Sequence, residues 1–302
     1  MFFSKTVIAL SPKRQVPRSQ RDALSGSPSF AAVTGNQSVS DFYEKNGYIV
    51  FKANEAFKKE WKQVEEAQLG PDQTFDQLVQ RLFSPCNSEE MLETEGIEYQ
   101  IFTPALDRGR RFIPNASTVK TYKPFNQLIS KGIDAAIRDL SVTETSLQDD
   151  KDLSYRLKRS EKTQLIISDV HAKDQAAHCD ANDLQHRMFW IINTVGKHGL
   201  DVWPGSHITL RDIRTIPEET FDPKEYRVIP RVHLLMEELS VVFISGGLLH
   251  RGPKNELGKL HVRGFGELDM LSSQGEQIEQ QKATEEQTHI LLKRFRCLFT
   301  DT

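Results

Sequence analysis

Cysteine is scarce in this sequence, with three among 302 residues. Cys86, Cys179 and Cys297 lie far apart and form no CxxC pair, which argues against a disulfide framework or a zinc ribbon and suits a reducing compartment. Long apolar runs are also missing, since no stretch approaches the roughly 20 residues that cross a bilayer. We therefore expect neither an integral membrane protein nor any other association with a membrane.

Positive charge is not in excess either. The formal net charge is −3 and the isoelectric point is about 6.3. Proteins that bind phosphate backbones usually carry a basic surface, so no nucleic-acid partner is expected. The 38% apolar and 27% charged residues are those of a globular protein long enough to bury a large core.

The N-terminal segment differs from the rest of the sequence. It contains five basic residues before the first acid, Asp22. This composition is typical of a disordered tail and also of a transit peptide, so we assign residues 1–37 to one or the other. Cytoplasm is the expected location, with mitochondrion or plastid as alternatives. Residues 38–302 are expected to form a single domain: mainly helical support (38–150), a β core (151–272) and a C-terminal helix (273–302).

The spacing of apolar residues changes at the middle of the chain. The first half has helical spacing and capping residues, with two β-prone runs, whereas the second half has short β-prone runs separated by turns. We predict helices at 40–44, 54–68, 74–83, 124–140 and 274–297, strands at 48–51, 98–103, 163–170, 186–195, 240–245 and 261–271, and turns at 196–199 and 251–255. The predicted fold class is mixed α/β with an all-β core, a β-barrel braced by N-terminal helices.

One histidine pattern indicates a metal site. Among nine histidines, only His178 has an acid two residues later, Asp180. Residues two apart on an extended segment point to the same side. His250 follows the apolar run 240–249, which would place it at the barrel mouth beside that pair. Two imidazoles and one carboxylate leave coordination positions open, the arrangement of non-haem Fe(II) oxygenases. A closed four-ligand zinc site is less consistent with the unpaired cysteines.

Arg263 lies on the next predicted strand, sharing one face with Phe265 and Glu267. An arginine fork binds a carboxylate through two parallel hydrogen bonds. A 2-oxoglutarate molecule that chelates iron through its keto-acid end presents a second carboxylate, and Arg263 is the candidate partner for it.

These motifs together resemble a known family. They are, in chain order, His178-Cys179-Asp180, residues 200–207 (LDVWPGSH), residues 248–255 (LLHRGPKN) and Arg263. In type and order they are similar to the motifs of the phytanoyl-CoA dioxygenase-like (PhyH-like) branch of the Fe(II)/2-oxoglutarate-dependent oxygenases. The resemblance spans about 163–269. It implies a double-stranded β-helix (a jelly-roll or cupin-like barrel), iron at His178, Asp180 and His250, and 2-oxoglutarate at Arg263. The implied activity is a dioxygenase that uses O2 to hydroxylate or otherwise oxidise a small organic or acyl substrate, releasing succinate and CO2.

The sequence departs from the family pattern at three places. Relatives usually carry Gly-Asp where residues 238–240 read Glu-Leu-Ser, the stretch 211–231 has the character of an insert, and Gly252 stands where many relatives have serine near the cosubstrate. Asp180 itself separates the chain from halogenases of this group, which carry a small residue there.

Two other functions fit the same residues. A cupin-like metalloenzyme, such as an isomerase or a cosubstrate-free dioxygenase, would use the same ligands but has no need for Arg263. A non-catalytic β-barrel binding module is the other alternative; loss of one ligand type would favour it, and all three are present.

Several further residues have plainer interpretations. We expect His207 to shape the PGSH loop, Cys179 to point away from the metal, His171 and His186 to lie at the surface or around the ligands, and Trp190 and Trp203 to lie in the core or pocket wall. Arg108, Arg110 and Arg111 are expected on a solvated loop, with a clamp for an anionic substrate as the alternative.

Overall fold

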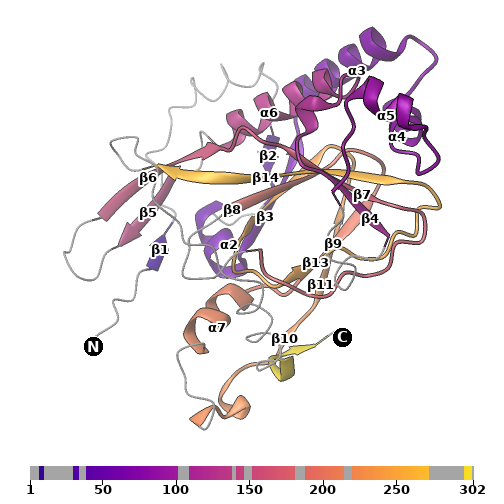
Figure 1. The fold of residues 1–302 in the computed structure, drawn as a ribbon. Coiled ribbons are helices and arrows are strands. Elements are labelled where there is room, and N and C mark those ends of the chain that lie inside the picture. Colours follow the sequence, from indigo (N-terminus) through magenta and orange to yellow (C-terminus); the bar gives the residue numbers. More distant parts are fainter. Residues whose placement is uncertain are drawn as a thin grey trace.

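The computed structural model describes residues 7–9, 30–33, 39–100, 109–137, 141–145, 152–180, 188–213, 220–271 and 296–300. They form a mixed helical and sheet structure whose core is an antiparallel sheet (Figure 1). The predicted C-terminal helix at 274–297, Arg108 and His186 lie outside the described residues. Two pieces of the predicted N-terminal tail are strands, β1 (Val7–Ala9) and β2 (Phe30–Ala32), which pair with β5 and β3.

Six α-helices lie in the described part of the chain, and local capping fixes several of their ends. Asn54 accepts from the Phe57 amide, and Thr74 and Gln77 form a reciprocal capping box. The helices are α2 (Val39–Asn46), α3 (Glu55–Leu69), α4 (Phe75–Leu82), α5 (Glu89–Glu95), α6 (Lys123–Ile137) and α7 (Ser206–Ile213). The four helices predicted at 40–44, 54–68, 74–83 and 124–140 are confirmed, whereas α5 and α7 were not predicted. No described helix is both long and apolar enough to pass through a bilayer.

The large sheet is antiparallel throughout. Its strands run in the order β1-β5-β6-β14-β8-β12-β3-β2, and β7 joins β14 to β4. The remaining bounds are β3 (Tyr48–Ala53), β4 (Arg110–Ile113), β5 (Ser141–Thr145), β6 (Asp152–Arg159), β7 (Gln164–Ser168), β8 (Met188–Asn193), β12 (Ser240–Ser245) and β14 (His261–Leu271).

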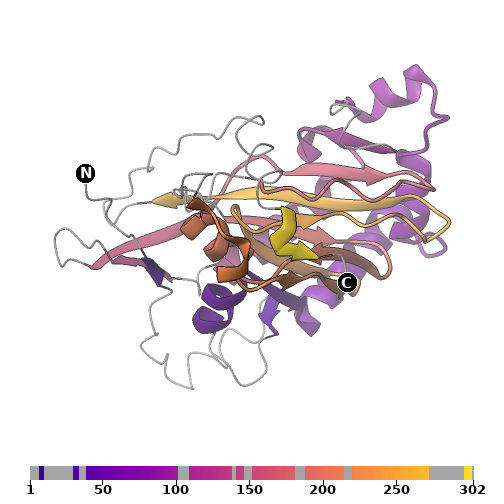
Figure 2. The same ribbon diagram turned by 90° about the horizontal axis from the view of Figure 1, so that it is seen from below.

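A smaller antiparallel sheet has the order β11-β9-β13, with β9 (His198–Val202), β11 (Val232–Met236) and β13 (His250–Arg251). Strands β10 (Ile229–Pro230) and β15 (Phe299–Thr300) form a short parallel pair. Figure 1 shows α3 to α6 on one side of the large sheet and the smaller sheet on the other. Seen from below, α7 and the β10–β15 pair lie on the near side, away from those helices (Figure 2).

Strand alternation divides the large sheet into two faces. On β8, Trp190 and Ile192 point into a core that α3, α4 and α6 cover. Phe189 and Ile191 point the other way and pack with Leu200 of β9 in a second core between the sheets. The register pairs Arg263 with Asn193 and Phe265 with Ile191, so the β14 side chains of this face also point between the sheets.

Two predictions of local structure were incomplete. The turn predicted at 196–199 ends two residues too late, because His198 and Gly199 already belong to β9. The strand predicted at 98–103 is reduced, within its described part, to one isolated bridge between Gln100 and Phe112. Strands β4, β5, β6, β9, β11 and β13 were not predicted, and part of β11 is exposed at the edge of the small sheet, as at Leu235.

Candidate metal centre and buried arginine site

His178, Asp180 and His250 come together, as the sequence predicts. One ligand atom from each lies within 4.8 Å of the others. Backbone pairing sets this geometry: the amide of each histidine donates to the carbonyl of the other at 2.9 Å, an isolated antiparallel bridge. His250 also begins β13, which pairs with β9 through Val202. The two histidines are therefore brought together by backbone hydrogen bonds before any metal binds.

Both imidazoles are held in the tautomer that a metal needs. Nδ1 of His178 lies 2.8 Å from the Ala176 carbonyl, and Nδ1 of His250 lies 3.0 Å from the Leu248 carbonyl. A carbonyl only accepts, so each Nδ1 carries the proton and each Nε2 keeps its lone pair. The Nε2 atoms lie 3.5 Å and 3.4 Å from the two oxygens of Asp180. Backbone-anchored imidazoles of this kind are the common support of metal sites.

The Asp180 carboxylate shows that the cluster is incomplete as a protein-only site. Its Oδ2 is buried and has no hydrogen-bond partner among the described residues. A buried unpaired carboxylate oxygen is costly unless a cation or donor satisfies it. Two neutral nitrogen donors and one anionic oxygen on one side of a common point suit a divalent metal with open positions. The residues present thus fit the ion that the sequence indicates.

Burial differs among the three ligands. The side chain of His250 is 4% exposed and that of His178 is 32% exposed. Burial lowers the pKa of His250, and the neighbouring His178 and Arg263 lower it further, although Asp180 raises it. The candidate centre is consequently open on the His178 side and closed behind His250.

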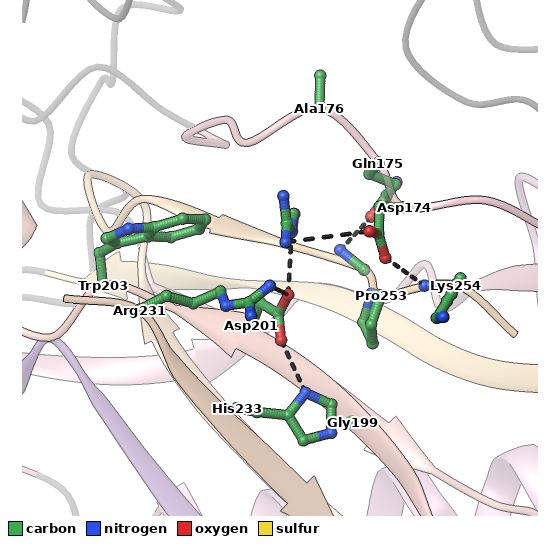
Figure 3. Close-up of polar contacts among 12 residues, drawn as sticks. Asp174, Gln175, Ala176, Gly199, Asp201, Trp203, Arg231, His233, Pro253 and Lys254 are labelled. Atoms are coloured by element: carbon green, nitrogen blue, oxygen red, sulfur yellow. Dashed lines mark hydrogen bonds and ion pairs between the residues drawn. The ribbon is translucent and has the colours of Figure 1, made fainter. Parts of the chain in front are cut away.

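A second carboxylate, Asp201 on β9, supports the His250 side of the centre (Figure 3). It is almost fully buried and accepts from Arg251 Nε at 2.9 Å, Arg231 Nη1 at 3.2 Å and His233 Nδ1 at 2.7 Å. Burial alone would raise the pKa of Asp201, but these hydrogen bonds and the two arginine charges lower it. Arg251 follows His250 directly and also lies over the Trp203 ring. Asp201 of β9 therefore ties together β13, which begins at the candidate ligand His250, and β11 on the other side of β9.

The segment before His178 is fastened to the segment after His250. Gln175 exchanges two hydrogen bonds with the backbone of Gly252, and Asp174 accepts from the Lys254 amide at 2.6 Å. A Cβ on residue 252 would lie 2.4 Å from Gln175 Oε1. This close approach favours glycine at position 252, because a side chain there would displace Gln175.

The prediction that Arg110 lies on a solvated loop was wrong. Arg110 is buried on β4, where its guanidinium donates to the carbonyls of Lys173 at 2.7 Å and Pro253 at 2.8 Å. The sequence interpretation failed because the arginine cluster straddles the start of a strand. Arg111 points to the other side, where it pairs with Asp169 at 2.7 Å and lies over Tyr99.

Arg263 is buried on the inner face of β14 and reaches across to β9. Its Nη2 donates to the Gly199 carbonyl at 2.7 Å and contacts Nδ1 of His198. The predicted placement on one face with Phe265 and Glu267 agrees with the register, which pairs all three with alternate β8 residues. A buried guanidinium between two sheets is consistent with a carboxylate-binding role, for which it has five N–H donors.

The other singled-out residues take no part in the metal cluster. Nε2 of His207 lies 3.1 Å from the Glu44 carbonyl, and its ring packs against Gly47, which agrees with a loop-shaping role. Cys179 Sγ donates to the Gly247 carbonyl at 3.4 Å. Trp190 and Trp203 are both buried, and His171 is exposed.

Sequence reasoning missed Asp201, His198 and His261. Asp201 had a usable signal, since a lone acid within the apolar segment 200–203 is buried only when it is paired. The two histidines gave none, because their neighbours come from strands far apart in the chain.

No family model matches the chain, and no curated protein matches it. Among solved structures, similarity is found to the non-heme alpha ketoglutarate-dependent carbocyclase SnoK from nogalamycin biosynthesis (TM-score 0.45, 15% identity, covering 82% of this chain and 95% of that one). The epimerase SnoN from the same biosynthesis has a TM-score of 0.44 and 12% identity over 76% and 79% of the two chains. HygX from Streptomyces hygroscopicus, solved with nickel and 2-oxoglutarate, has a TM-score of 0.43 and 11% identity over 78% and 87%. At these values the assignment of function rests on the site itself.

Proposed function

We propose that this protein is an Fe(II)- and 2-oxoglutarate-dependent dioxygenase. The observation that carries the proposal is the His178–Asp180–His250 cluster, in which both Nε2 lone pairs face a carboxylate whose Oδ2 is buried without a hydrogen-bond partner in the described chain. His178, Asp180 and His250 would hold the metal. Bound Fe(II) with chelated 2-oxoglutarate supplies the activation of O2 and the oxidising power for C–H chemistry.

Arg263 is proposed to bind the distal carboxylate of 2-oxoglutarate. It lies on the inner face of the large sheet and reaches Gly199 of β9, the strand that also pairs with β13 at His250. A buried fork fixes the orientation of a dicarboxylate as well as its affinity. This orientation would leave the keto-acid end directed toward the metal ligands.

The remaining residues of the site position groups and exclude water. Asp201 and Arg251 hold the His250 strand, and Gln175 holds the segment before His178. The apolar side chains between the sheets, including Phe189 and Leu200, keep the interior dry. A dry interior strengthens the electrostatic interactions within it and protects reactive species from water.

The fold family and the reaction proposed here are more specific than the observed architecture. We propose that the two facing sheets form a double-stranded β-helix of the PhyH-like branch, within a single domain from residue 38 to 302. The substrate would be a small organic molecule or an acyl conjugate, and the reaction a hydroxylation or a related oxidation.

An anaerobic titration with Fe(II) and 2-oxoglutarate tests the proposal. The chelate has a weak visible charge-transfer band, which we expect with the wild-type protein and not with His178→Ala. In Arg263→Ala the band should require much more 2-oxoglutarate, while the same substitution at exposed His171 should leave it unchanged. Failure of the wild-type protein to bind metal at all would overturn the proposal.

A second function, a cupin-like metalloenzyme that uses no 2-oxoglutarate, is favoured by one observation. Nη2 of Arg263 already contacts His198 and Gly199, so the guanidinium has a structural role as well. Iron binding without a charge-transfer band, at any concentration of 2-oxoglutarate, would select this alternative.

A further inference from the structure

Trp203 lies directly after β9 and contacts both residues that flank the candidate ligand His250. Its backbone amide donates to the Leu249 carbonyl at 3.0 Å. The guanidinium of Arg251 lies over its ring, with Cζ 5.7 Å from the ring centroid, within the range of a cation–π interaction. Trp203 is 2% exposed and lies beside the Asp201 network (Figure 3). It therefore fixes the chain on each side of His250.

The turn that begins at Trp203 holds Leu249 through both of its backbone polar groups. Oγ of Ser206 accepts from the Leu249 amide at 2.8 Å, while the Trp203 amide donates to the Leu249 carbonyl. The turn is closed by the Ser206 amide, which donates to the Trp203 carbonyl at 3.0 Å. All three residues are buried. The position of His250, the next residue after Leu249, thus depends on where this turn lies.

The indole N–H of Trp203 is held by the C-terminal segment, residues 296–300, which consists of the short 3-10 helix η4 (Arg296–Leu298) and β15. Nε1 donates to the Thr300 carbonyl at 2.9 Å, and the Arg231 amide donates to the same carbonyl at 3.1 Å. A buried indole N–H normally needs such an acceptor. One carbonyl of the C-terminal segment therefore sets the direction in which the Trp203 ring points.

Apolar packing joins the same parts of the molecule. Leu298 of the C-terminal segment is 1% exposed and belongs to one buried cluster with Trp203 and Leu249. The residues on either side of the candidate ligand His178 pack against this cluster. The C-terminal segment thus supports a small core that borders the neighbours of both histidine ligands.

We propose that Trp203 is a positioning residue of the metal centre and that the C-terminal segment latches it in place. The inference rests on the proposed function, because it assumes that His178, Asp180 and His250 bind a metal. Ligand atoms bind a metal well only when they are held within about 0.5 Å of the required geometry. Without the latch the Trp203 ring would no longer hold the chain on either side of His250, and Nε2 of His250 would lose its fixed position.

Titration with Ni(II) tests the role of the Trp203 ring. Trp203→Phe keeps an aromatic face for Arg251 but removes the indole N–H. We expect the Kd for Ni(II) to rise about tenfold, the lower end of the effect of residues that support metal ligands. Trp61→Phe on α3 makes the same substitution in the core on the helical side of the large sheet and should leave the Kd unchanged. Denaturant unfolding of both variants separates a general loss of packing from the effect on the metal.

Removal of residues 299–302 tests the latch, because it deletes the Thr300 carbonyl. The Kd for Ni(II) should again rise about tenfold. Truncation combined with Trp203→Phe should bind Ni(II) about as tightly as either change alone, since both changes break the same hydrogen bond. In the untruncated chain, Leu298→Ala should weaken Ni(II) binding, whereas Leu78→Ala in the helical core should not.

Two outcomes would overturn the inference while the proposed function stands. One is a Kd in Trp203→Phe that matches the Kd of the wild type or of Trp61→Phe. The other is independent effects of truncation and substitution, about a hundredfold in the combined variant, because Trp203 and the C-terminal segment would then act separately. Failure of the wild-type protein to bind Ni(II) is a different result, which overturns the proposed function and the inference with it.

Discussion

Arg251 donates from Nε to Oδ2 of Asp201 at 2.9 Å, and Arg251 is the residue that follows the candidate metal ligand His250. The Asp201 carboxylate also accepts hydrogen bonds from Arg231 and His233, which lie at the start of β11 on its other side. A single buried charge thus joins β9, β11 and β13 at the place where β13 presents His250. Its contribution should be visible both in stability and in metal binding.

We predict that Asp201→Asn lowers the free energy of unfolding by about 3 kcal/mol, because it removes the buried charge that Arg251 and Arg231 share. Ni(II) affinity should fall about 10- to 100-fold, as for other residues that support metal ligands. Denaturant unfolding and metal titration measure the two effects. The same change of charge at exposed Glu225, Glu225→Gln, is the control. Loss of stability with unaltered Ni(II) affinity would show that Asp201 does not position His250.

For Asp180 the effect of a substitution on stability and its effect on metal binding should separate. Asp180→Asn removes the charge of a carboxylate whose buried Oδ2 has no hydrogen-bond partner in the described residues, so the metal-free protein should be as stable as wild type or more so. Wild type at a metal concentration of about 100 times the dissociation constant should gain about 2.7 kcal/mol, and the variant should gain almost nothing. Thermal unfolding with and without Ni(II) measures this, with Asp72→Asn, the same substitution at an exposed position, as the matched control. A variant that Ni(II) stabilises as strongly as wild type would exclude Asp180 as a ligand.

His198 of β9 and His261 of β14 are both buried, with stacked rings whose centroids lie 3.9 Å apart, and they predict a loss of stability in acid. In the folded protein the pKa of His198 is lowered to about 3 by burial and Arg263, and that of His261 is lowered well below 6.5 for the same reasons. Below about pH 6.5 the unfolded chain takes up protons at these residues and the folded chain does not, so stability is highest above pH 6.5 and falls as the pH drops toward 3.

Each histidine contributes up to about 1.4 kcal/mol per pH unit within that window. The comparison of wild type with His198→Phe by denaturant unfolding at pH 7, 6 and 5 isolates the contribution of His198 from that of the carboxylates. The variant should show the shallower decline. Parallel curves would mean that His198 is protonated in the folded state.

On the face of the large sheet that the helices cover, position 266 has room only for glycine. A Cβ at this position would lie 2.5 Å from Cζ2 of Trp190, whose ring is fully buried. We expect Gly266→Ala to cost about 1–3 kcal/mol through overpacking. In the double variant Gly266→Ala/Trp190→Phe the smaller ring leaves room for the methyl group. The stability lost in the double variant should therefore be smaller than the sum of the losses in the two single variants. Strict additivity would contradict the predicted clash.

The sequence predicted those parts of the site that depend on local spacing. His178 and Asp180 lie two apart, and His250 follows an apolar strand, so alternation and strand length suffice to bring them to one side. Four of the helices were predicted for the same reason, since capping residues and helical spacing are local.

Pairing between distant strands could not be predicted in the same way. Strand β9 begins at His198 in a glycine-containing stretch that resembles a turn, and its side chains acquire their partners from β11, β13 and β14. Asp201 and His198 therefore look like ordinary polar residues until the sheets face each other. The burial of Arg110 has the same origin, because its carbonyl partners belong to segments brought in from the other half of the chain.

The paired amides of His178 and His250 also make the candidate centre observable without any metal. Each N–H is engaged with the opposite carbonyl, so both protons exchange with solvent only when the two segments separate. Their exchange rates measure the free energy of opening the ligand set itself, apart from global unfolding. A preorganised site gives slow exchange at both amides in the metal-free protein, and metal binding then slows both by the same factor.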